Sequence, residues 1–61
     1  MEVQLKSVKD IKRVPDGALI KFSENDRERY LDKFSMCIVD DGGGILITEQ
    51  LLTDNIVIAV F

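Results

Sequence analysis

The residues that could do covalent or metal chemistry are few in this chain. It has no histidine and one cysteine, Cys37. Nucleophilic catalysis of the Ser–His or Cys–His type is therefore excluded, as is a zinc site built from histidine or clustered cysteine ligands. Cys37 lies within the apolar segment MCIVD, so we expect a small buried side chain rather than a reactive thiol.

Carboxylates are the remaining candidates for acid–base work. Glu24, Asp26 and Glu28 are clustered, but they alternate with Asn25 and Arg27 in a segment that we interpret as an exposed loop. A chain this small also cannot easily enclose a dry pocket. We therefore expect a protein that is not an enzyme and that holds no metal and no cofactor.

The segment DDGGG, residues 40–44, raises the question of a phosphate-binding loop. Such a loop needs converging backbone N–H groups and usually a following helix and a lysine. Here the strand-like segment ILIT follows, no Lys or Arg lies downstream, and Asp40 and Asp41 would repel a phosphate. Asp41 and Gly42 are a preferred central pair of a type I′ turn, so we predict a hairpin, and the extra glycines permit a longer loop or a bulge. A calcium site is disfavoured because two adjacent acids lack the alternating ligand spacing of a calcium loop.

The segment ENDRERYLDKF, residues 24–34, combines cations with aromatic side chains. Arg and Tyr are frequent anchors at protein interfaces. The predicted partner-binding residues are Arg27, Arg29, Tyr30, Lys33 and Phe34. The alternative is that these side chains only solubilise a loop.

Size and charge limit the classes of function. The chain has 61 residues, eight Lys and Arg against eleven Asp and Glu, and a net charge of −3. Residues 6–13 carry four of the cations, whereas residues 40–61 carry none. This balance argues against nonspecific binding of nucleic acid, which requires a cationic footprint. No apolar run approaches the roughly 18 residues that span a bilayer, and the N-terminus lacks a signal pattern, so we expect a cytoplasmic protein without a membrane partner.

Short apolar runs separated by turn residues predict an all-β fold in one domain, residues 1–61. The expected strands lie in MEVQLK (1–6), ALIKF (18–22), RYLDKF (29–34), MCIVD (36–40), GILIT (44–48) and NIVIAVF (55–61). We expect SENDRE (23–28) to be a loop and EQLLTDN (49–55) to be a loop or a single helical turn. The segment from Ser7, a plausible N-cap, to Arg13 is expected to form one short turn that Pro15 ends, with positive φ at Gly17. The predicted architecture is a small, strongly bent antiparallel barrel of five to six strands.

The last predicted strand is apolar on both faces. Ile56, Ile58 and Val60 share one face, and the other face carries Val57, Ala59 and Phe61. A chain this short buries only about 60% of its unfolded surface and has no disulfide or metal to stabilise it. We therefore predict a homodimer in which the face with Val57, Ala59 and Phe61 is covered by a second chain. The alternative is that this strand is central and is crossed by the turn at residues 51–52.

The order of these segments resembles the small SH3-like β-barrel proteins of bacteriophage type. The resemblance rests on LKSVKDIKRVPDGALIKF, then RYLDKF, CIVDDGGGIL and DNIVIAVF, and it spans about residues 7–61. The matching positions are Asp10, Ile11, Gly17, Phe22, Tyr30, Val39, Gly43 or Gly44, and Asp54. It implies an SH3-like barrel and an accessory protein that acts in the cytoplasm of an infected bacterium by occupying a surface on a host factor, defence enzymes included.

The leading functional hypothesis is a non-enzymatic homodimer that binds a host protein and inhibits or redirects it. A second hypothesis is an oligomer that sequesters a nucleotide-like signal through Arg27, Arg29 or Lys33 and stacks it on Tyr30 or Phe34. A third is a small virion or assembly component.

Overall fold

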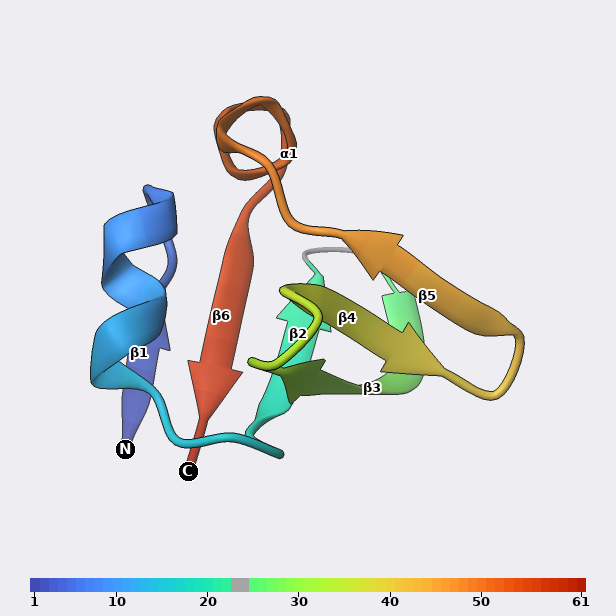
Figure 1. The fold of residues 1–61 in the computed structure, drawn as a ribbon. Helices are drawn as coiled ribbons and strands as arrows, with labels where there is room; N and C mark the ends of the chain where they lie inside the picture. The colour runs from blue at the N-terminus through green and yellow to red at the C-terminus, as the bar shows by residue number, and fades with distance from the viewer. Residues whose placement is uncertain (23–24) are drawn as a thin grey trace.

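The fold is a single antiparallel sheet with two short helices, seen here in a computed structural model that describes the backbone of residues 1–22 and 25–61 and their side chains except at 25–27. The elements in chain order are β1 (Glu2–Gln4), the 3₁₀ helix η1 (Val8–Arg13), β2 (Leu19–Phe22), β3 (Asn25–Asp32), β4 (Cys37–Asp40), β5 (Gly43–Leu46), α1 (Glu49–Asp54) and β6 (Val57–Val60). The strands are ordered β1-β6-β2-β3-β4-β5. Figure 1 shows the sheet bending so that β4 and β5 run across the direction of β1 and β6. The predicted all-β class is confirmed.

Alternation along the strands builds the core on one face of the bent sheet. Ile20 pairs with Ala59 of β6, and Leu31 of β3 pairs with Ile38 of β4; all four side chains are buried. We call this packed side the inner face and the opposite side the outer face. The rest of the core comes from both helices and the connecting segments: Leu5, Ile11, Val14, Ala18, Ile47, Leu52 and Val57.

The turn predicted after Ser7 is present as η1, with Ser7 as its N-cap. Oδ2 of Asp10 accepts hydrogen bonds from the backbone N–H groups of Lys6 at 2.9 Å and Ser7 at 3.1 Å, which fixes the entry to the helix. After the helix, the N–H of Ala18 donates to the carbonyl of Pro15, and Gly17 has a φ of +82°. Positive φ at the third position of such a turn favours glycine, as expected from the sequence.

The helical turn expected near Leu51 is α1. Oγ1 of Thr48 accepts from the N–H of Leu51 at 3.1 Å, so a threonine caps the helix start. The helix buries Leu52 in the core. The carboxylate of Glu49 accepts from the backbone N–H of Val8, which ties α1 to η1. Within the part of the chain that the structure describes, no helix has the length and hydropathy that crossing a membrane requires.

The predicted boundary of the third strand is wrong. We expected a loop over residues 23–28, but β3 already begins at Asn25 and ends at Asp32, and residues 33–36 form a turn. Residues 23–24 lie outside the described residues. Asn25 pairs with Phe22 of β2, so pairing with a neighbouring strand outweighs the low strand propensity of this polar segment.

The glycine hairpin is confirmed, but its predicted turn type is wrong. Asp40 pairs with Gly43, which leaves Asp41 and Gly42 as the two-residue loop. A type I′ turn needs positive φ at both loop residues. Neither has it here; the positive φ, +135°, falls on Gly43. The N–H of Gly42 donates to Oδ1 of Asp40 at 2.7 Å, a local side-chain bond that stabilises this alternative turn.

The last strand is central rather than terminal in the sheet. β6 lies between β1 and β2, so neither of its edges is free to pair with a second copy. Val57 and Ala59 are 0% exposed and belong to the core of the single chain. Their burial is therefore explained without a second chain, and the apolar side chains of β6 that reach the surface are on the opposite face.

Candidate functional site

The outer face carries a continuous line of apolar side chains across four strands. Val60 of β6 pairs with Leu19 of β2, Leu19 pairs with Tyr30 of β3, and Tyr30 pairs with Val39 of β4. Directly paired residues on one face have Cβ atoms about 4.5–5.5 Å apart and contact each other. Tyr30 is 43% exposed and the other three are half-buried. We call these four residues the outer row.

Glycine ends the outer row. Val39 pairs with Gly44 of β5. A Cβ atom at Gly44 would lie 3.4 Å from Cγ1 of Val39 and 3.7 Å from Cβ of Cys37. The absence of a side chain at Gly44 therefore leaves Val39 uncovered on this side.

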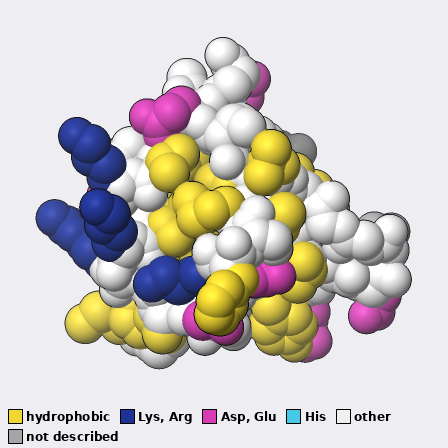
Figure 2. Space-filling view, viewed as in Figure 1, with side chains coloured by type: hydrophobic (Ala, Val, Ile, Leu, Met, Phe, Trp, Pro, Cys, Tyr) yellow, Lys and Arg dark blue, Asp and Glu magenta, His cyan; other side chains and the backbone are white. Residues whose placement is uncertain are grey.

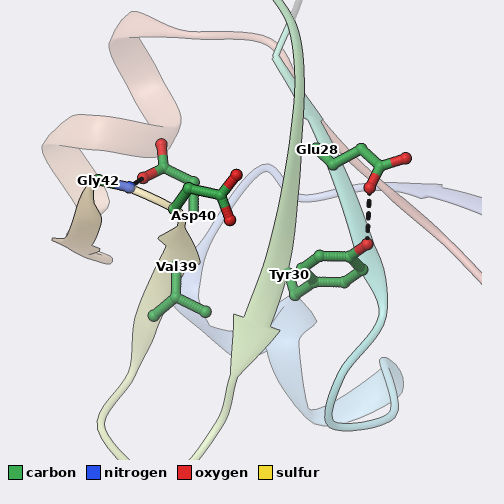
Figure 3. A pocket seen from close by; sticks show the side chains of 6 residues that line it. Glu28, Tyr30, Val39, Asp40 and Gly42 are labelled. Atoms are coloured by element: carbon green, nitrogen blue, oxygen red, sulfur yellow. Dashed lines mark hydrogen bonds between the residues drawn. The ribbon is translucent and has the colours of Figure 1, made fainter.

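An open hollow of about 700 Å³ lies beside Tyr30 and Val39. Its lining residues are Glu28, Tyr30, Val39, Asp40, Asp41 and Gly42. Figure 3 shows how β3 supplies one side and the end of β4 with its turn supplies the other. Three of the six lining residues are acids, and although Asp40 is paired with Arg29, Glu28 and Asp41 make this an acidic hollow that favours a cation over an anion.

Tyr30 is held in place within the acidic hollow. Its hydroxyl donates to Oε2 of Glu28 at 2.9 Å, shown as the dashed line in Figure 3. This hydrogen bond to a carboxylate raises the pKa of Tyr30 above its ordinary value, and the charges of Glu28 and Asp41 raise it further. The phenol is therefore a neutral aromatic surface fixed beside negative charge. Such a surface suits an apolar side chain and a cation together.

Arg29 and Tyr30 are adjacent in sequence but lie on opposite faces of β3. Arg29 is 8% exposed, and its guanidinium carbon lies 4.7 Å from the centre of the Phe22 ring. Its Nε is 3.7 Å from Oδ2 of Asp40, while Nε and Nη1 have no hydrogen bond. The structure thus places this predicted partner-binding residue on the inner face, where its guanidinium packs on Phe22.

The other predicted partner-binding residues whose side chains are described do not line the hollow. Lys33 and Phe34 lie in the turn between β3 and β4, and Phe34 is 98% exposed. The carboxylate of Asp32 accepts from the N–H of Phe34 at 3.1 Å and from the hydroxyl of Ser35 at 2.7 Å. These bonds, led by that from Ser35, lower the pKa of Asp32. Arg27 lies in β3, and its side chain is outside the described residues.

The three predicted self-association residues do not form one exposed surface. Val57 and Ala59 lie in the core, whereas Phe61 is 41% exposed and its N–H donates to the carbonyl of Met1. On the outer face of β6, Ile58 and Val60 are half-buried. The surface that β6 offers is therefore the face opposite to the one predicted.

Sequence reasoning missed Glu28, Val39 and Asp41 as members of one site. Part of the signal was present, because Glu28 and Tyr30 are two residues apart and so share a face of any strand that contains both. The assignment of Glu28 to a loop hid this relation. The position of Asp41 near Tyr30 depends on the register between β3 and β4, which no local sequence pattern predicts.

Known proteins add no further information, because no family model, no curated protein and no solved structure matches the chain significantly. Among the residues whose side chains are described, no group of three or more Cys, Asp or Glu could hold a metal ion. The geometry of the outer face therefore carries the functional argument.

Proposed function

We propose that this chain is a non-enzymatic binding protein that attaches to another protein through the outer row and the acidic hollow. The observation that supports this most is the position of Tyr30. It belongs both to a continuous apolar surface and to a hollow rimmed by carboxylates. Partly exposed aromatic side chains next to polar rims are typical of interface centres.

The chemistry of the hollow defines the partner. An apolar side chain of the partner packs on Tyr30 and Val39, and a neighbouring Lys or Arg meets Glu28 and Asp41. The resemblance to phage barrel proteins points to a host protein in the bacterial cytoplasm, which binding would inhibit or redirect. A nucleotide-like ligand is a poorer fit because the hollow is acidic and Arg29 lies on the other face.

A second copy of the chain is the competing occupant. Figure 2 shows Lys and Arg side chains gathered over η1, where Lys9, Lys12 and Arg13 are exposed. This cationic surface could meet the acidic hollow of another copy. Native mass spectrometry of the wild-type protein separates this case, since a homodimer lost on Asp41→Lys substitution would identify a second copy as the occupant.

The test is quantitative capture from a bacterial extract on four immobilised proteins: wild type, Tyr30→Ala, Asp41→Lys and Asp54→Lys. Asp54 is an exposed acid in α1, so its substitution makes the same charge change far from the hollow in sequence. We expect a protein that wild type and Asp54→Lys retain equally and that the other two lose by roughly tenfold or more. Equal retention on all four, or no retained protein, would contradict the proposal. Melting curves confirm that each variant is folded.

A further inference from the structure

The outer edge of β5 is the least protected part of the sheet. β5 is the last strand in the sheet order, and all four of its residues are exposed. Figure 1 shows the β4–β5 hairpin extending away from β1, β6 and the helices, with no neighbouring strand beyond β5. An edge of this kind presents backbone donors and acceptors that another chain can use.

The register identifies which backbone groups point outward. In an antiparallel pair, residues that exchange both hydrogen bonds alternate with residues whose N–H and C=O groups point away from the partner strand. The N–H of Ile47 donates to the carbonyl of Met36 at 2.8 Å, so that pair is of the bonded kind. Two residues earlier in β5, the pair of Ile45 and Ile38 is of the bonded kind as well. The pairs that Leu46 and Gly44 form with β4 are of the other kind. The free edge therefore offers the N–H and C=O groups of Gly44 and Leu46.

Side chains on β5 add apolar contacts on both faces of this edge. Leu46 is 60% exposed on the outer face and Ile45 is 40% exposed on the inner face. The strand contains no charged residue and no proline, which are the usual devices that prevent strand addition. The opposite edge is different, because β1 is shorter and presents Glu2 and Gln4 on the outer face.

We propose that the β5 edge binds an extended segment of another protein as a seventh strand, through the outward backbone groups of Gly44 and Leu46. The segment carries a Lys or Arg that meets Asp41, because Asp41 directly precedes β5 and no cation of this chain occurs after Lys33. A second copy is disfavoured as the occupant. In an antiparallel pair of two β5 strands, neither copy would bring a cation to Asp41 of the other, because no Lys or Arg occurs after Lys33.

The probe for this site is the blocked peptide Lys-Thr-Val-Thr-Val-Thr-Lys, compared with the same peptide bearing Glu at both ends and with a version N-methylated at alternate residues. Binding is followed by nuclear magnetic resonance on wild-type protein. We expect the amide hydrogen exchange of Gly44 and Leu46 to slow by tenfold or more with the first peptide. The Glu-ended peptide should bind roughly tenfold more weakly. The N-methylated peptide, which keeps the side chains but lacks donors, should not bind.

Two variants locate the site. Leu46→Lys places a guarding charge at the edge and should abolish binding, whereas Gln4→Lys makes a similar change on β1 and should leave it intact. Tyr30→Ala should also leave peptide binding intact. The experiment can therefore contradict the β5-edge proposal without contradicting the proposal for the outer row. The inference would be overturned if the first peptide left the amide hydrogen exchange of Gly44 and Leu46 unchanged, or if all three peptides bound equally well. It would also be overturned if raising the protein concentration without any peptide slowed the exchange of these two amides. The N-methylated peptide keeps the test valid if Leu46→Lys does not fold.

Discussion

The inner and outer faces of the sheet are both apolar, but they are apolar for different reasons. Along β6, Val57 and Ala59 are fully buried, whereas Ile58 and Val60 beside them are only half-covered. The inner face is required by the fold, because it forms the core against η1 and α1. Nothing among the described residues covers the outer row in the same way. An apolar face that folding does not require is available for binding.

The first and largest test of this comparison is a matched pair on β6. Val57→Asp places a carboxylate in the core and should abolish cooperative melting, since burying an unpaired charge costs more than the roughly 3–9 kcal/mol expected for a chain of this size. Ile58→Asp makes the same kind of change on the outer face and should lower stability by about 1 kcal/mol. Thermal melting followed by circular dichroism measures both. Similar melting of the two variants would show that the faces are assigned wrongly.

Arg29 provides the second test, because its inner-face position predicts a packing role. Arg29→Ala uncovers Phe22 and removes the ion pair between Arg29 and Asp40, so we expect the free energy of unfolding to fall by about 2 kcal/mol. Arg29→Met also removes the ion pair but keeps an unbranched side chain packed on Phe22, so it should lose about 1 kcal/mol less than Arg29→Ala. Urea unfolding measures these changes. Lys21 is the exposed control. If Lys21→Ala lowered the free energy of unfolding as much as Arg29→Ala, the distinction between buried and exposed cations would be refuted.

Much of the local structure could be predicted, because its signals lie within a few residues. Ser7 and Pro15 bound η1, Gly17 takes positive φ, and the Asp41–Gly42 pair forms the hairpin loop. The central position of β6 was only the alternative interpretation of the sequence, because strand order depends on pairing between residues more than 30 positions apart. The acidic hollow could not be predicted either, because its lining residues come from β3 and from the end of β4 with its turn, and only strand pairing brings them together.

Acid unfolding gives a smaller test, at the turn that presents Phe34. The pKa of Asp32 is lower in the folded protein, so its contribution to stability is present above the ordinary aspartate pKa and is lost as the pH falls through the lowered value. The pKa of Asp10 is lowered as well, by the backbone bonds from Lys6 and Ser7. We expect the Tm of Asp32→Asn to fall less steeply in acid than the Tm of the wild type. The remaining decline should include the contribution of Asp10. An unchanged slope would mean that Asp32 does not hold this turn.

The smallest expected effect is spectroscopic and belongs to the outer face alone. Tyr30 is the only tyrosine and the chain has no tryptophan, so the absorbance of tyrosinate reports this residue directly. Its raised pKa means that the neutral phenol is favoured by folding, and this contribution is lost as the pH rises through the raised value. Glu28→Gln should move the titration to lower pH. A wild-type midpoint equal to that of free tyrosine would contradict the geometry of the hollow.

The most direct test of the outer face as a binding surface is photo-crosslinking in a bacterial extract, with a benzophenone amino acid in place of Tyr30 in one protein and of Lys12, exposed on η1, in another. The account predicts that the probe in place of Tyr30 crosslinks a distinct protein, that excess wild-type chain competes for it and Asp41→Lys does not, and that the probe in place of Lys12 gives no such product. Crosslinks of equal yield from both positions, or only between copies of the chain, would contradict it.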